Sequence, residues 1–241
     1  MRASELNCLN AIKDAFYERN NMHIEKCNNA FQEVKNIIFS ATQTNDINKF
    51  PDFFSGDSII EHFTITSSKE TRKGSYYKIH EINGAKKTKK YFETTDKEFI
   101  GSHHTPNTMH TASTENIYNS FTYADFVASF KKNFDNHYKS LIKSNYSNQK
   151  VVFLIEQDGA RLCIYEKGSF NRFYLLSEDK QLLQYLRDKY PAVNYVLMRE
   201  SDCVEIIDLS QINKLIASSK EGLDVRGGRM VNTSIKLYLD F

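Results

Sequence analysis

Apolar residues in the first forty positions recur at helical spacing. One set falls at steps of three and four residues and comprises Leu6, Leu9, Ile12 and Phe16. After a polar break at Asn20-Asn21, a second set with similar spacing comprises Ile24, Cys27, Phe31, Val34 and Ile38. Because each set forms a single apolar stripe, the pattern predicts two amphipathic helices over residues 3–40 that pack against the rest of the protein.

The pattern then changes to one typical of strands. Residues 59–66 are rich in β-branched and aromatic side chains and follow the turn signal Ser55-Gly56-Asp57, which predicts two strands joined by a tight turn. The segments SYYKIHEI and AKKTKKYF flank Asn83-Gly84, the pair that best tolerates the positive φ angles of a two-residue turn. We therefore expect a second hairpin over residues 75–93.

Residues 94–120 are polar and aperiodic, which predicts a long loop. A helix is expected from Thr122, where Thr122 and Asp125 make an approximate capping box. Its apolar face comprises Phe126, Phe130, Phe134, Tyr138 and Leu141. The later segments VVFLIEQ, ARLCIYE, RFYLL, VNYVLM, CVEIIDL and SIKLYLDF predict strands, and helices are expected over residues 178–189 and 210–218.

These elements predict one α+β domain over residues 1–241, with helices around a central mixed and largely antiparallel β-sheet. Its parts are a helical segment (1–48), strands with a hairpin (49–93), the loop (94–120) and a helix and sheet remainder (121–241). No stretch approaches the roughly 18 consecutive apolar residues of a membrane span, and the N-terminus lacks a secretory apolar core. The four cysteines form no CxxC pair. We therefore expect a cytoplasmic protein with no membrane partner.

The net charge of +2 predicts no polyanionic partner, but the charge is unevenly distributed. Residues 69–97 hold nine Lys or Arg against four acids. The densest part comprises Lys86, Lys87, Lys89 and Lys90 with Tyr91. Such lysines favour contact with nucleic-acid phosphates while an aromatic ring stacks on a base. A solvated charged hairpin would have the same sequence, so that alternative stays open.

Two carboxylates are candidates for chemistry. On a strand, Glu61 shares its face with the apolar residues Ile59, Phe63 and Ile65, where an ionised carboxylate is costly unless it is compensated. If the turn at 55–57 folds the chain back, Asp52 lies near Glu61, and the pair makes a hard-oxygen site suited to Mg²⁺. Sheet adjacency would add Glu156, although exposure at a turn also explains that residue. The alternative is structural, because Pro-Asp pairs commonly open turns and Glu61 can pair with a lysine.

The order of predicted elements resembles that of the PD-(D/E)xK nuclease superfamily, whose members cut phosphodiesters with Mg²⁺. It runs from a helix to a strand with Pro51-Asp52, a turn and a strand with Glu61, followed by a helix and a strand. The resemblance implies a restriction-endonuclease-like core in which Asp52 and Glu61 bind Mg²⁺ or Mn²⁺. It also implies an acidic ligand from the N-terminal helices, for which Glu33 is the candidate. Phe63 stands where the family has its catalytic lysine, so a lysine from elsewhere, such as Lys69, Lys73 or Lys132, would have to replace it.

The resemblance implies a magnesium-dependent endonuclease, or a protein derived from one, that cleaves or binds DNA. Restriction or defence against foreign DNA suits such a fold by analogy. Two alternatives stay open: a catalytically inactive nucleic-acid-binding protein, favoured by Phe63, and a protein-interaction domain with no nucleic-acid role. The oligomeric state is undetermined, and a homodimer is compatible with the sequence.

Overall fold

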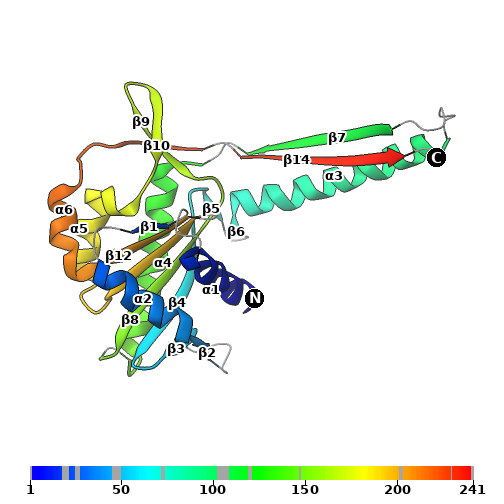
Figure 1. The fold of residues 1–241 in the computed structure, drawn as a ribbon. Helices are drawn as coiled ribbons and strands as arrows, with labels where there is room; N and C mark the ends of the chain where they lie inside the picture. Colours follow the sequence, from blue (N-terminus) through cyan, green and yellow to red (C-terminus); the bar gives the residue numbers. More distant parts are fainter. Residues whose placement is uncertain are drawn as a thin grey trace.

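The computed structural model describes residues 2–17, 22–24, 28–44, 50–71, 74–101, 109–118, 121–146, 148–200, 203–228 and 230–239. In this part of the chain, a body built on a large sheet carries an elongated arm that projects to one side (Figure 1). No helix among these residues is both long and apolar enough to cross a membrane.

The central sheet has seven described strands in the order β1-β12-β11-β8-β4-β3-β2. They are β1 (Met22–Ile24), β2 (Thr42–Gln43), β3 (Phe53–Ser55), β4 (Ser58–Thr66), β8 (Lys150–Asp158), β11 (Tyr195–Glu200) and β12 (Cys203–Asp208). The pairs β4–β8, β8–β11 and β1–β12 are parallel, and the other strand pairs of the described chain are antiparallel. The predicted α+β class with a mixed, largely antiparallel arrangement is confirmed.

Helices cover both faces of this sheet. On one face lie α1 (Arg2–Tyr17) and α2 (Asn28–Ser40), the two predicted N-terminal helices. On the other lie α4 (Tyr123–Lys143), α5 (Lys180–Lys189) and α6 (Ile212–Ser218), with the short 3-10 helices η2 (Leu176–Glu178) and η3 (Leu209–Gln211) beside them. Alternate residues of β4 divide between two core clusters, because successive side chains of a strand point to opposite faces.

Helix α4 begins where the sequence predicts. The Thr122 hydroxyl accepts a hydrogen bond from the Asp125 backbone N–H at 3.0 Å, which satisfies one of the free donors of the first turn. The apolar face of α4 packs on the sheet, where the tilted rings of Phe134 and Phe153 have centroids 4.9 Å apart. In sequence α4 directly precedes β8, which then pairs with β4 in parallel, and the helix lies over one face of the sheet.

The arm consists of α3 (Tyr76–Gly101) and a two-stranded antiparallel ribbon of β7 (Met109–Tyr118) and β14 (Met230–Leu239). One face of the ribbon contacts α3: Asn116 donates a hydrogen bond to Thr88 at 2.9 Å, and the ring of Tyr238 stacks on Phe99. In Figure 1 the ribbon follows the helix along its length.

Two sequence predictions are therefore wrong. Residues 75–93 form most of α3 and no hairpin, and residues 94–120 contribute the end of α3 and strand β7 instead of a loop. Asn83-Gly84 lies inside the helix because packing against the ribbon outweighs the turn preference of that pair. A side chain at Gly84 would place its Cβ 2.6 Å from the Tyr118 hydroxyl, so glycine lets helix and ribbon approach closely. Residues 102–108 and 119–120 lie outside the described residues.

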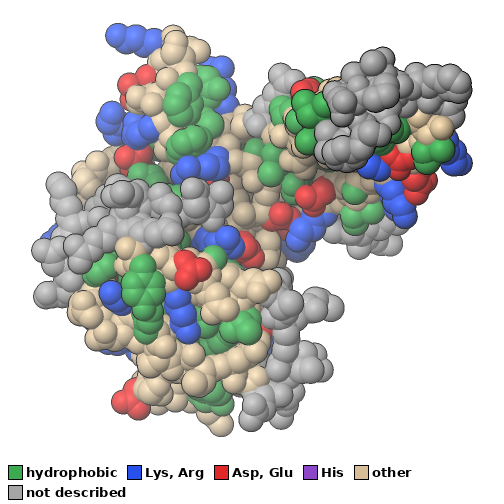
Figure 2. Space-filling view, turned by 45° about the vertical axis from the view of Figure 1, so that its right-hand side comes forward, with side chains coloured by type: hydrophobic (Ala, Val, Ile, Leu, Met, Phe, Trp, Pro, Cys, Tyr) green, Lys and Arg blue, Asp and Glu red, His purple; other side chains and the backbone are tan. Residues whose placement is uncertain are grey.

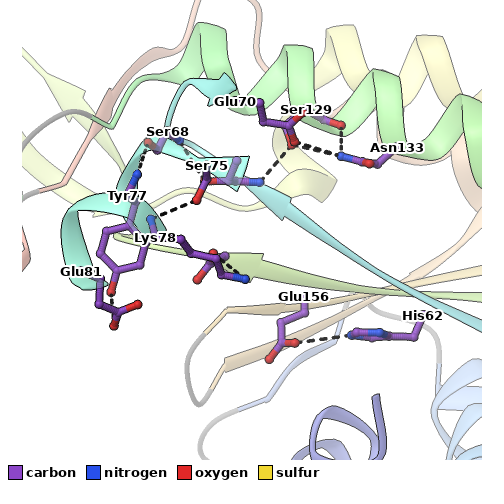
Figure 3. Close-up of polar contacts among 12 residues, drawn as sticks. His62, Ser68, Glu70, Ser75, Tyr77, Lys78, Glu81, Ser129, Asn133 and Glu156 are labelled. Carbon is purple, nitrogen blue, oxygen red and sulfur yellow. Dashed lines mark hydrogen bonds and ion pairs between the residues drawn. The ribbon is translucent and has the colours of Figure 1, made fainter. Parts of the chain in front are cut away.

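Polar contacts fix the base of the arm to the body (Figure 3). Glu70, in the small hairpin of β5 (Glu70–Thr71) and β6 (Gly74–Ser75), accepts a hydrogen bond from Ser129 of α4 at 2.8 Å and pairs with Lys132. Lys78 of α3 lies 3.2 Å from Asp158 of β8. These contacts hold the first turn of α3 against the sheet. A third small sheet has the order β10-β9-β13, from β9 (Leu162–Glu166), β10 (Ser169–Phe173) and β13 (Asp224–Gly227).

Candidate metal centre and nucleic-acid interface

The tight turn between β3 and β4 brings Asp52 and Glu61 together. Phe53 pairs with Ile60 in the strand register, so Asp52 and Glu61 occupy the next pair of positions. The backbone N–H of His62 donates a hydrogen bond to Asp52 Oδ2 at 2.8 Å, and the carboxyl groups of Asp52 and Glu61 are close enough for each to affect the pKa of the other. The structure thus places side by side the two groups that the sequence predicts as neighbours.

If both groups were ionised, this carboxyl pair would carry more negative charge than the described side chains around it compensate. Only 7% of Glu61 is exposed, and burial raises the pKa of Glu61 to about 8. Burial and the neighbouring charge of Glu61 raise the pKa of Asp52 to about 6. Oε2 of Glu61 meets no N–H or O–H donor of the described chain. A proton shared with Asp52 or a bound cation would satisfy that oxygen, so the residues present fit a divalent ion.

His137 of α4 completes the cluster. Its Nδ1 lies 2.6 Å from Oε1 of Glu61, and its ring stacks on Phe63 with centroids 4.5 Å apart. Burial lowers the pKa of His137 to about 4, so the imidazole is neutral at pH 7. Phe63, which stands in place of the family's lysine, therefore supports an imidazole. The sequence held one signal for His137: it interrupts the apolar stripe of α4 between Phe134 and Leu141 at steps of three and four residues.

The other predicted site residues lie elsewhere. Glu33 of α2 pairs with Lys150 and accepts a hydrogen bond from the Tyr195 hydroxyl at 2.7 Å, so its contacts in the described chain do not include the carboxyl pair. The contacts that the structure shows for Lys69 and Lys132 are at the base of the arm. Lys73 lies outside the described residues. The structure thus shows no contact of Glu33, Lys69 or Lys132 with Asp52 or Glu61 among the described residues.

Glu156 does not join Glu61, which corrects the expectation from sheet adjacency. In the parallel register Glu61 is beside Phe153, whereas Glu156 is beside Thr64, which lies three residues further along β4 and points to the opposite face. The side chain of Glu156 consequently lies on the face of the sheet that α1 covers, 3.5 Å from Nε2 of His62. It also pairs with Arg199 there.

The predicted nucleic-acid contacts lie along α3. Lys86, Lys87, Lys89, Lys90 and Tyr91 are all exposed. Helical spacing places Lys86, Lys90 and Lys97 on the side of α3 away from Thr88, the residue that contacts the ribbon. Lys89 also lies 3.9 Å from Glu93, an exposed pair that contributes little stability. On the visible side of the arm in Figure 2, charged side chains of both signs alternate with apolar ones.

Comparisons of the chain with protein-family models, curated protein sequences and solved structures found no match in any of the three. Function must therefore be argued from the carboxyl pair, from His137 and from the exposed lysines of α3.

Proposed function

We propose that the chain is a nuclease-like protein that uses Mg²⁺ or Mn²⁺ and acts on DNA, with Asp52 and Glu61 as ligands of the ion. The observation that carries this proposal is the meeting of Glu61, which is buried on β4, with the half-buried Asp52 just before β3. Burial raises the pKa of both groups, and each group also affects the pKa of the other. A bound divalent cation would compensate the two negative charges of the ionised pair.

The order of elements supports a nuclease of the PD-(D/E)xK type. Helix α2 leads into the antiparallel meander β2-β3-β4, and α4 then leads into β8, parallel to β4. The Pro-Asp pair precedes the middle strand of the meander and Glu61 lies on its third strand. The resemblance expects a strand with Pro-Asp and, after a turn, a strand with an acidic residue, and this arrangement is close to that order. The restriction-endonuclease-like core remains part of the proposal.

When bound, a divalent ion would polarise a phosphoryl oxygen and lower the pKa of a water molecule. Glu61 and His137 determine the protonation state that such binding requires. Glu61 must release its proton before it can act as a ligand, since a pKa of about 8 keeps it protonated at neutral pH. His137 holds Oε1 of Glu61, and its neutral Nδ1 can accept the proton in a hydrogen bond. We assign His137 a positioning role, which Phe63 supports by stacking.

The arm supplies the surface for nucleic acid in this proposal. Helix α3 has 26 residues, which corresponds to about 39 Å. Its exposed lysines can follow a phosphate backbone, and an exposed Tyr91 can stack on a base. A second candidate function is a binding protein without catalysis. It is favoured by Phe63, which leaves the motif without its lysine.

A cleavage assay tests the catalytic part. Plasmid DNA is incubated with the wild-type protein in Mg²⁺ or Mn²⁺, beside Asp52→Asn, Glu61→Gln and the control Asp57→Asn, which changes an exposed carboxylate in the same turn. We expect cleavage by the wild type and the control, and a loss of roughly 100-fold or more in the other two variants. Equal cleavage by all four proteins would indicate a contaminant and refute the assignment.

A binding assay tests the arm. Fluorescence anisotropy with labelled DNA and RNA compares the wild type with a variant in which Lys86, Lys87, Lys89 and Lys90 are changed to glutamine. The control changes four other exposed lysines: Lys139, Lys143, Lys167 and Lys214. The slope to compare is that of log binding constant against log salt concentration. If the arm binds phosphates, this slope should be less steep by up to about 4 in the arm variant and by much less in the control. Binding without cleavage favours the inactive alternative, and no binding leaves a protein-interaction domain.

A further inference from the structure

A second cluster of metal-ligating side chains lies on the face of the sheet opposite Asp52 and Glu61. Cys8 of α1, His62 of β4 and Glu156 of β8 each offer one ligand atom, and these atoms lie within 4.8 Å of one another. Cys8 is fully buried, His62 is 7% exposed, and the side chain of Glu156 is 25% exposed. Sulfur, imidazole nitrogen and carboxylate oxygen are the ligand atoms that zinc takes in proteins.

The imidazole of His62 points into this cluster, where its Nε2 makes one long ion-pair contact with Oε2 of Glu156 at 3.5 Å. Nε2 is buried and has no closer hydrogen-bond partner in the described chain. Figure 3 shows the ring and the carboxylate facing each other from their two strands. Because buried polar atoms in native proteins nearly always have a partner, this nitrogen indicates a ligand.

The carboxylate of Glu156 is already oriented for such a ligand. Nη1 of Arg199, on the neighbouring strand β11, donates a hydrogen bond to Oε1 of Glu156. That contact leaves Oε2 directed at His62. Carboxylates that bind metals are commonly held by a second hydrogen bond of this kind, which fixes their orientation. The positive charge of Arg199 also limits the negative charge of the cluster when Cys8 is a thiolate.

We infer that Cys8, His62 and Glu156 bind one zinc-type divalent ion, with a fourth coordination position on the partly exposed side of Glu156. Binding would convert the Cys8 thiol to a thiolate and release its proton to water. Ligand atoms at 2.0–2.3 Å from zinc are roughly 3.5 Å apart in a tetrahedral site, so the three side chains need to approach by about 1 Å. The ion would connect α1 to β4 and β8, and it is separate from the magnesium site proposed above.

Cobalt binding is the direct test, because Co²⁺ replaces zinc and absorbs in the near ultraviolet when a thiolate binds it. The full chain is prepared with a chelator and a reducing agent, freed of both, and titrated with Co²⁺. We expect one equivalent to bind with a thiolate absorption band that added Zn²⁺ removes. Cys8→Ser should abolish the band. The control Cys163→Ser changes a half-buried cysteine elsewhere and should retain it. Glu61→Gln should also retain it, since Glu61 faces the other side of the sheet.

The inference is overturned if the folded wild-type protein gives no thiolate band, or if the band survives in Cys8→Ser. If circular dichroism shows that Cys8→Ser does not fold, Glu156→Gln carries the test, since it removes the charge of one ligand and preserves its shape. We expect that variant to bind zinc roughly 100-fold more weakly in a competition assay. Unchanged zinc affinity in folded Glu156→Gln would leave Cys8, His62, Glu156 and Arg199 as a metal-free polar network.

Discussion

Replacing Glu61 by glutamine removes the proton that the carboxyl pair holds, and we expect this change to alter how stability depends on pH. In the folded protein burial raises the pKa of Glu61 from 4.5 to about 8. A carboxyl group with a raised pKa binds its proton more tightly in the folded state than in the unfolded chain. Its contribution to stability is therefore fully present below about pH 4.5 and is lost as the pH rises through 8.

In one pH interval, Glu61 is the member of this cluster whose protonation most affects stability. The pKa of His137 is lowered from 6.5 to about 4, so the stability that it contributes is present above pH 6.5 and is lost only as the pH falls through 4. Asp52, with a pKa raised to about 6, has released most of its proton by pH 6.5. Between pH 6.5 and 8 we therefore expect Glu61 to account for a loss of about 1–2 kcal/mol in the free energy of unfolding.

Urea denaturation followed by circular dichroism at a series of pH values measures this loss. The quantity to compare is the wild-type free energy of unfolding minus that of Glu61→Gln, which should fall by about 1–2 kcal/mol from pH 6.5 to 8. A matched control is Glu200→Gln, since burial raises the pKa of Glu200 to about 7 at a position paired with Arg161. Because Glu61 is intact in this control, its free energy of unfolding should still show the loss that Glu61 causes between pH 6.5 and 8.

The result also bears on the proposed metal. If Mg²⁺ replaces the proton of Glu61, saturating Mg²⁺ should abolish the decline toward pH 8 in the wild type and leave Glu61→Gln unchanged. A difference between wild type and variant that stays flat from pH 6.5 to 8 without metal would refute the reasoning, because it would mean that Glu61 is ionised throughout the interval. The buried carboxyl pair would then need a compensating charge that the structure does not show.

Three stability predictions can be checked by the same denaturation assay. Gly227→Ala should cost about 3 kcal/mol, because its Cβ would lie 1.7 Å from the backbone oxygen of Phe121; Gly84→Ala, which meets only side-chain atoms, should cost less. Phe134→Ala should cost about 3–5 kcal/mol, since that ring is fully buried, and a cost below 1 kcal/mol would contradict the packing of α4. Thr122→Ala should cost about 1 kcal/mol through loss of the helix cap, unless water satisfies the Asp125 N–H equally well.

The body of the fold could be predicted because its local signals and its packing agree. The alternation along β4 placed Glu61 and His62 on opposite faces, and the turn at Gly56, with a φ of 55°, determined that Asp52 would meet Glu61. The cap at Thr122 and the apolar stripe after it determined α4. In each case the local structure that a few consecutive residues favour is also the one that buries their apolar side chains against the sheet.

The arm could not be predicted, because the preference of Asn83-Gly84 conflicts with its packing. The residues of α3 that meet the ribbon include Tyr77, Gly84, Thr88 and Phe99. Glycine and threonine interrupt the apolar positions of this stripe, so its hydrophobic signal is weak. His137 was missed for a related reason: its role depends on Glu61, 76 positions earlier in the chain.

The ribbon of the arm joins residues that are synthesised far apart. Tyr118 and Met230, which pair at one end of β7 and β14, are roughly 110 positions apart, and most of the body lies between them in sequence. While the chain emerges from the ribosome, β7 remains an unpaired strand beside α3 until residues 230–239 arrive. The projecting part is thus the last to be completed, and an interruption of synthesis before β14 would leave a finished body bearing an open strand edge.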